Sequence, residues 1–280
     1  MSAFTPRTDA ARAAASVRAV LPGARSAGER LLLLPGLGQT PAHWGPFARW
    51  LTGRGLTLLA AEPAALAAGS TAPRGSYARV REMAGALAAA CREHGVAGVL
   101  GHSAGAPAAL LTASLAGFAT VTLIEPVPAH FGLRAATPDP VLRRHGPGGP
   151  ETSHLVALPD EEPGDSLRRL HPLAAETTLR AITAALRAQR PAPAPPPPLP
   201  ATKHSRLTDR AEQTAAALAS HHGQVLVLRG AHSALLTRAD AETLTARAAN
   251  GTLRVVERAG HSPHIDAPRA TVAALLEGRS

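Results

Sequence analysis

The stretch Val96–Leu115 reads VAGVLGHSAGAPAALLTASL, and it decides the expected fold of this 280-residue chain. Apolar residues over 96–100 predict a buried strand, 101–105 a sharp turn, and 108–111 the first part of a helix. A turn this tight leaves no room for a Cβ atom at either of its glycines. Ser103 then stands at the apex of a strand–turn–helix unit, the setting in which G-x-S-x-G exposes a reactive hydroxyl. An ordinary serine on a glycine-rich turn would give the same pentapeptide, so the pattern needs support elsewhere.

Apolar runs and helical periodicities alternate along most of the chain. This alternation predicts an α/β fold with a mainly parallel central sheet flanked by helices on both faces. The other expected strands are an edge strand over 17–21 and buried strands over 30–34, 56–60, 121–125, 224–229 and 252–257. The expected helices cover 46–53, 76–94, 209–222 (capped by Thr208), 238–249 and 268–276.

The alternation lapses for about a hundred residues after Pro126, far more than one crossover helix needs. We therefore predict a core in two parts, 1–126 and 201–280, with a helical or irregular insertion over 127–200. Within the insertion, 172–188 has helical periodicity. The proline-rich run 191–200 is typical of a polyproline II spacer, and an SH3 ligand is the functional alternative.

Composition narrows the range of partners. The formal charge of +9 and the pI near 11.3 suggest a polyanion, but the arginines are scattered and Lys203 is the only lysine. Aromatic residues make up 2% of the chain, so a stacking platform for single-stranded nucleic acid is not expected. The 45% hydrophobic content is sufficient for a globular core. We therefore expect no nucleic-acid partner, and the sequence does not predict an oligomeric state.

Location and redox chemistry follow from simple features. Residues 1–15 contain scattered charges and lack an apolar core, which argues against a secretory signal. The long apolar stretches are interrupted by Gly, Pro or Arg, so we expect no membrane span, no membrane partner and a cytoplasmic protein. Cys91 is the single cysteine, which excludes an intrachain disulfide; we expect it to be a small buried residue.

A candidate base for Ser103 follows the last expected strand, in RAGHSPHIDAP (258–268). Histidine has a pKa suited to taking a hydroxyl proton near neutral pH. His261 would lie at the carboxyl edge of the sheet, where Ser103 also lies, and His264 is its rival. Histidines are numerous, but H-E-x-x-H and cysteine pairs do not occur, so we expect neither a metal site nor a cofactor.

From about Arg30 to Leu276 the chain resembles the α/β-hydrolase superfamily. Pro35–Gly38 with Trp44 resembles the family's oxyanion loop, 101–105 its nucleophile elbow, and Gly260–His261 followed by Pro268 its histidine loop. The insertion stands where the family usually carries its lid.

The resemblance implies a role for each matching position. Ser103 would be the nucleophile, His261 the general base, and the backbone N–H groups of Leu37 and Ala104 the oxyanion hole. His264 would then belong to the pocket or to the surroundings of the base. The expected substrate-pocket residues are Gly36, His43, Trp44, His102, Ser233 and His264.

The acid departs from the family pattern. The family usually carries Asp or Glu in the loop after the penultimate strand, and here that loop reads GAHSALL (230–236), which puts Ser233 or Ala234 at the position. Some members take the acid from the end of the preceding strand, which makes Glu125 the best substitute. Asp240 or another carboxylate, and a Ser–His pair helped by Ser233, are the alternatives.

Together these features predict a serine hydrolase or acyltransferase of the esterase or thioesterase kind. Its small-molecule substrate would be a carboxylic ester or thioester, attacked by Ser103 to give an acyl-enzyme. The alternative is a non-hydrolytic ligand-binding protein on the same fold, because the usual acid position carries no carboxylate.

Overall fold

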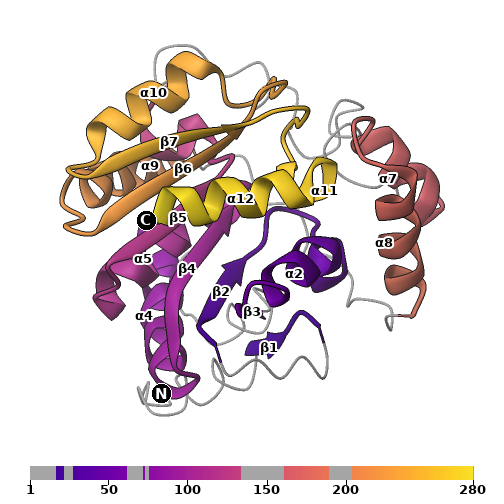
Figure 1. The fold of residues 1–280 in the computed structure, drawn as a ribbon. Helices are drawn as coiled ribbons and strands as arrows, with labels where there is room; N and C mark the ends of the chain where they lie inside the picture. The colour runs from indigo at the N-terminus through magenta and orange to yellow at the C-terminus, as the bar shows by residue number, and fades with distance from the viewer. Residues whose placement is uncertain are drawn as a thin grey trace.

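A computed structural model describes residues 17–21, 28–61, 72, 76–133, 161–188 and 204–279, the side chains of 204–208 excepted. Its centre is a seven-stranded sheet with the order β1-β3-β2-β4-β5-β6-β7 (Figure 1). The strands are β1 Val17–Ala19, β2 Arg30–Leu34, β3 Thr57–Ala61, β4 Val96–His102, β5 Thr120–Ile124, β6 Gln224–Gly230 and β7 Gly251–Val256. Neighbouring strands are parallel except β1, which pairs antiparallel with β3 at the edge. The predicted fold class is confirmed.

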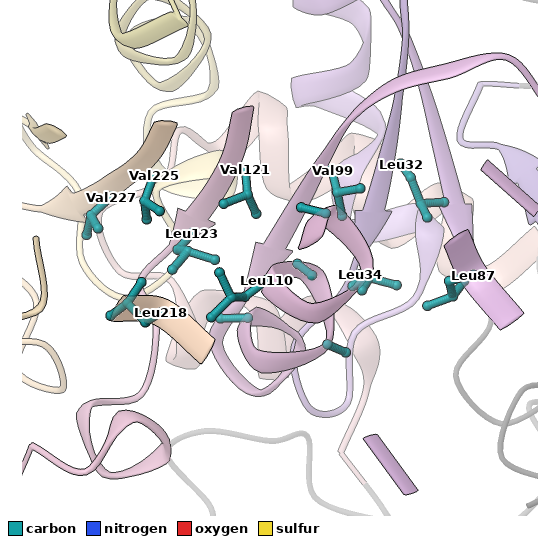
Figure 2. Packing of buried hydrophobic residues seen from close by; sticks show 14 of the residues in the cluster. Leu32, Leu34, Leu87, Val99, Leu110, Val121, Leu123, Leu218, Val225 and Val227 are labelled. Carbon is teal, nitrogen blue, oxygen red and sulfur yellow. The ribbon is translucent and has the colours of Figure 1, made fainter. Parts of the chain in front are cut away.

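One face of the sheet packs on four helices: α4 Tyr77–Glu93, α5 Ala106–Ala116, α9 His204–Ala219 and α10 Arg238–Arg247. Successive strand residues point to opposite faces, so every second side chain of a strand enters the same core. Figure 2 shows the strand residues of this face meeting Leu87 of α4, Leu110 of α5 and Leu218 of α9. Cys91 is buried in the same core, as predicted.

The opposite face packs on α2 Gly45–Thr52 and α12 Pro268–Arg279. The intervening strand residues, such as Leu33 and Leu100, turn to this side. In Figure 1 α12 crosses in front of the sheet beside α2. Both faces of the central strands are therefore covered, as the uninterrupted apolar runs predict.

The part of the insertion that the structure describes contains α7 Pro163–Leu170 and α8 Glu176–Ala188, which lie to one side of the sheet (Figure 1). They pack on each other and, through Ile265, on the core. The helix predicted over 172–188 begins four residues late, and α7 was not predicted. A residue before proline is disfavoured in the helical region, so α7 ends before Pro172. The proline-rich run lies outside the described residues, and the boundaries of the insertion stay a prediction.

Short elements complete the chain: η1 Pro41–Trp44, η2 Ser103–Gly105, η3 Pro128–Phe131 and α11 Pro263–Asp266. The helix predicted from residue 209 begins five residues earlier, at His204, so Thr208 lies inside α9 and does not cap it. The helices of the described ranges include none with the length and apolarity of a membrane span.

Candidate active site

The carboxyl ends of the central parallel strands bring three distant residues together. His102, the last residue of β4, is in register with Ile124, the last residue of β5. Ser103 and Glu125 therefore leave adjacent strands at the same level, and His261 follows β7 by five residues. His261 Nε2 lies 3.0 Å from Ser103 Oγ, and His261 Nδ1 lies 3.0 Å from Glu125 Oε2. The structure thus joins a hydroxyl, an imidazole and a carboxylate in one hydrogen-bonded chain.

The turn around Ser103 is held in an unfavourable backbone conformation. Ser103 has φ +49°, a region that residues other than glycine seldom adopt. A Cβ atom at Gly101 would lie 2.5 Å from Ala109 Cβ, and one at Gly105 would lie 2.4 Å from Leu34 O. This confirms the predicted need for both glycines. Backbone strain of this kind persists only where the surrounding structure imposes it, as here between β4 and α5.

Glu125 is fully buried, also has a positive φ (+46°), and is surrounded by hydrogen-bond donors. Gly230 N–H donates to Oε1 (2.7 Å), while Ser233 Oγ–H (2.6 Å) and His261 Nδ1–H donate to Oε2. A buried carboxylate is costly unless such partners satisfy it. Asp240, the alternative acid, instead bonds to Thr237 at the start of α10. Among the acids that the sequence left open, the structure brings Glu125 to His261.

This carboxylate also determines which nitrogen of His261 carries the proton. An ionised carboxylate only accepts hydrogen bonds, so Nδ1 must donate to it. A neutral imidazole then has its lone pair on Nε2, facing Ser103 Oγ–H. The histidine is thereby ready to accept the serine proton, and its side chain remains 21% exposed.

The loop after β2 passes directly over Ser103. A Cβ atom at Gly36 would lie 3.1 Å from Ser103 Cβ and 2.6 Å from His102 Nδ1, so this approach requires glycine. Leu37 follows and is 73% exposed, and Ala104 is the middle residue of the short helix η2. The two residues predicted to form the oxyanion hole thus belong to the two segments that meet at Ser103; that role stays a prediction.

The histidines His102 and His264 lie next to this hydrogen-bonded chain, but they form their own contacts within the protein. His102 Nε2–H donates to the carbonyl oxygen of His261 (2.9 Å), and its Nδ1 lies 2.9 Å from Gln39 Oε1. His264 is fully buried, stacks on the Trp44 ring at 3.5 Å, and faces the Gln39 amide. Burial holds the pKa of both imidazoles well below the ordinary value, so both are neutral at pH 7. Of His261 and His264, the two candidate bases, His261 is the one within hydrogen-bond reach of Ser103.

His43 and His171 are further neutral histidines nearby. Thr40 N–H donates to His43 Nδ1, and burial lowers the pKa of His43 to about 4. His171 follows α7, and burial lowers its pKa to about 3. Its Nδ1 lies 3.9 Å from Asp266 Oδ1. The pocket role predicted for His43, like that for Gly36, Trp44, His102, Ser233 and His264, stays a prediction.

Sequence reasoning gave no role to Gln39, Asp266 or Arg229. Gln39 accepts the Trp44 Nε1–H and contacts both buried histidines, which fixes the loop after β2. Asp266 accepts Gly260 N–H (2.8 Å), and burial raises the pKa of this carboxyl to about 6. For Gln39 the available signal was a polar side chain directly after the glycine-rich loop 35–38, and for Asp266 it was a carboxylate within the histidine loop. Arg229 carried no signal, because it lies inside an apolar strand.

No cluster of three or more potential metal ligands occurs among the described side chains. The expectation of a metal-free and cofactor-free site stays a prediction. The alternative of a ligand-binding protein was motivated by the missing acid at 233–234. Glu125 supplies a carboxylate to His261, which removes the reason for that alternative.

Comparisons with known proteins agree with this architecture. The chain is similar in structure to the Mycobacterium tuberculosis esterase Rv0045c, with 19% identity, 99% of each chain covered and a TM-score of 0.60. It is also similar to E-2-(acetamidomethylene)succinate hydrolase (17% identity, 94% of each chain, TM-score 0.60). A third similar structure is the esterase EaEST from Exiguobacterium antarcticum (14% identity, 94% of this chain and 95% of the other, TM-score 0.58). At these identities the likeness shows the fold alone.

Sequence comparison is more specific. No curated protein sequence matches the chain. The model of the alpha/beta hydrolase family matches residues 31–275, which include Ser103, Glu125 and His261. The match covers most of the chain and extends from β2 into α12. On this match and the geometry above, the chain belongs to the alpha/beta hydrolase family.

Proposed function

We propose that this protein is a serine hydrolase that cleaves a carboxylic ester or thioester through an acyl-enzyme on Ser103. One observation carries the proposal: the unbroken chain of hydrogen bonds from Ser103 Oγ through His261 to Glu125. A hydroxyl is a weak nucleophile until a base removes its proton, and His261 Nε2 is positioned to do so.

The proposed reaction has two halves. In the first, Ser103 Oγ attacks the substrate carbonyl carbon while its proton passes to His261 Nε2, and the N–H groups of Leu37 and Ala104 stabilise the oxyanion. The intermediate collapses, His261 returns the proton to the leaving oxygen or sulfur, and an ester to Ser103 remains. In the second half, His261 activates water, which releases the acid and restores the serine.

The histidines around the site are compatible with the proposed proton transfer to His261. Burial lowers the pKa of His43, His102, His171 and His264, so these four histidines are neutral at pH 7 and add no positive charge near His261. In the proposed reaction an imidazolium forms on His261, and the Glu125 carboxylate, whose Oε2 lies 3.0 Å from Nδ1, stabilises its positive charge. Transfer of the acyl group to an acceptor other than water would use the same intermediate.

Hydrolysis of p-nitrophenyl acetate and butyrate, and of a short acyl thioester, tests the proposal. We expect the wild type to turn over at least one of them and Ser103→Ala to lose nearly all of this activity. Ser220→Ala, which alters an exposed serine of the loop after α9, is the matched control and should behave as wild type. Equal turnover by Ser103→Ala and wild type would refute the proposal. Ligand affinity without any turnover would favour the binding-protein alternative.

A further inference from the structure

Ser233 bonds to the carboxylate oxygen that serves the histidine. Its Oγ lies 2.6 Å from Glu125 Oε2, and this oxygen also lies 3.0 Å from His261 Nδ1. Ser233 is 8% exposed and Glu125 is fully buried, so water has little access to this contact. The hydroxyl of Ser233 therefore forms a buried hydrogen bond to the Glu125 carboxylate.

The direction of this hydrogen bond is fixed by its neighbours. Leu236 N–H donates to Ser233 Oγ (3.2 Å), which uses one lone pair of the hydroxyl. The carboxylate can only accept, so the Ser233 O–H must point at Oε2. Two donors, Ser233 O–H and His261 Nδ1–H, then meet at one oxygen, while Gly230 N–H occupies the other.

A buried arginine, Arg229, is hydrogen-bonded to the backbone of the loop that carries Ser233. Arg229 donates from Nε to Leu236 O (2.8 Å), from Nη1 to Ala231 O (3.3 Å) and from Nη2 to Ser233 O (3.4 Å). One rigid guanidinium thus fixes three carbonyls of a six-residue segment. Ser233 is consequently presented to Glu125 by a braced loop.

We propose that Ser233 is a positioning residue that fixes the rotation of the Glu125 carboxylate. The inference rests on the proposed function. Without the Ser233 bond the carboxylate retains two donors, Gly230 N–H and His261 Nδ1–H, and it can turn further about its last side-chain torsion, which is intrinsically broad. Oε2 would then spend less time facing Nδ1. Hydrogen bonds to charged groups are about twice as strong as neutral ones, so this single contact has a measurable effect.

The first test compares Ser233→Ala with Ser233→Thr. For the alanine variant we expect kcat to fall about tenfold, the change that corresponds to ~1.4 kcal/mol, with KM nearly unchanged. The acid limb of the pH profile of kcat/KM should move to lower pH, because a carboxylate that faces Nδ1 less of the time stabilises the imidazolium less. Ser233→Thr retains the hydroxyl and should recover most of the rate. Equal rates and equal pH profiles for wild type and Ser233→Ala would overturn the positioning role.

A readout without substrate separates this inference from the proposed function. The Nδ1–H proton of His261 should give a downfield proton NMR signal in the wild type, shifted or lost in Ser233→Ala. If the wild type hydrolyses nothing and the signal still responds to Ser233, the proposed function fails and the positioning role stands. If the wild type is active and neither the signal nor the kinetics respond, the positioning role is wrong.

Discussion

Replacing Glu125 by glutamine changes one atom of a fully buried group, and the structure determines how the amide must sit. Gly230 N–H lies 2.7 Å from Oε1 and can only donate, so the amide oxygen takes that position. The NH₂ group then occupies the place of Oε2, 3.0 Å from His261 Nδ1. A donor now faces the nitrogen that formerly donated.

The consequence is the wrong tautomer of His261. Nδ1 must accept from the amide, so the ring proton moves to Nε2, which then has no lone pair for Ser103. The same exchange of acid for amide in serine proteases lowers kcat about 10⁴-fold. We expect a loss of about 10³–10⁴-fold in kcat, equal to about 4–5.5 kcal/mol of transition-state stabilisation, with KM changed little.

The assay is steady-state hydrolysis of p-nitrophenyl butyrate by wild type and Glu125→Gln. Glu277→Gln is the control, since it makes the same chemical change on an exposed carboxylate of α12. Thermal unfolding checks that each variant is folded. A kcat for Glu125→Gln within tenfold of wild type would refute the assignment of Glu125 as the acid.

Three further predictions concern stability. Gly105→Ala should lower the free energy of unfolding by about 3 kcal/mol or more, because the new Cβ would lie 2.4 Å from a backbone oxygen of β2. Gly85→Ala, on α4 with open space around it, should raise the free energy of unfolding by about 0.5–1 kcal/mol. Urea titration checks both variants. Burial lowers the pKa of His171 to about 3 in the folded state, against about 6.5 unfolded, so its contribution to stability is present above pH 6.5 and is lost as pH falls. Between pH 7.5 and 5 the wild type should therefore lose about 2 kcal/mol more stability than His171→Leu, measured by urea titration at the two pH values. Asp266, with its raised pKa of about 6, contributes in the opposite direction in both proteins and cancels from this difference. Arg229→Met should cost about 2–3 kcal/mol by leaving three loop carbonyls unpaired, seen as a lower urea midpoint; an unchanged midpoint would contradict the bracing role.

Much of this fold could be predicted from local sequence. The apolar runs of β2, β4, β5 and β6 are buried on both faces and have few alternatives. Glycine at 101 and 105 specified the turn around Ser103 because no other residue fits there. In the insertion α7 was not predicted and α8 begins four residues later than predicted, because these helices bury few apolar side chains and their apolar pattern is sparse.

The identity of the acid could not be decided from sequence. Glu125 before a proline reads as an ordinary strand end, and its orientation depends on φ +46° and on Gly230 N–H from a neighbouring strand. The bond from Ser233, 108 residues away, is equally invisible in a linear pattern. Such contacts arise from the register between β5 and β6, which only the assembled sheet determines.

The most direct measurement is the site of covalent capture. A fluorophosphonate reacts with a serine hydroxyl only when a base activates it, and peptide mass spectrometry then locates the adduct. We expect one stoichiometric adduct on Ser103, absent in Ser103→Ala and strongly slowed in His261→Ala. An unlabelled wild type, or equal labelling of Ser103→Ala, would contradict the claim that this serine is the nucleophile.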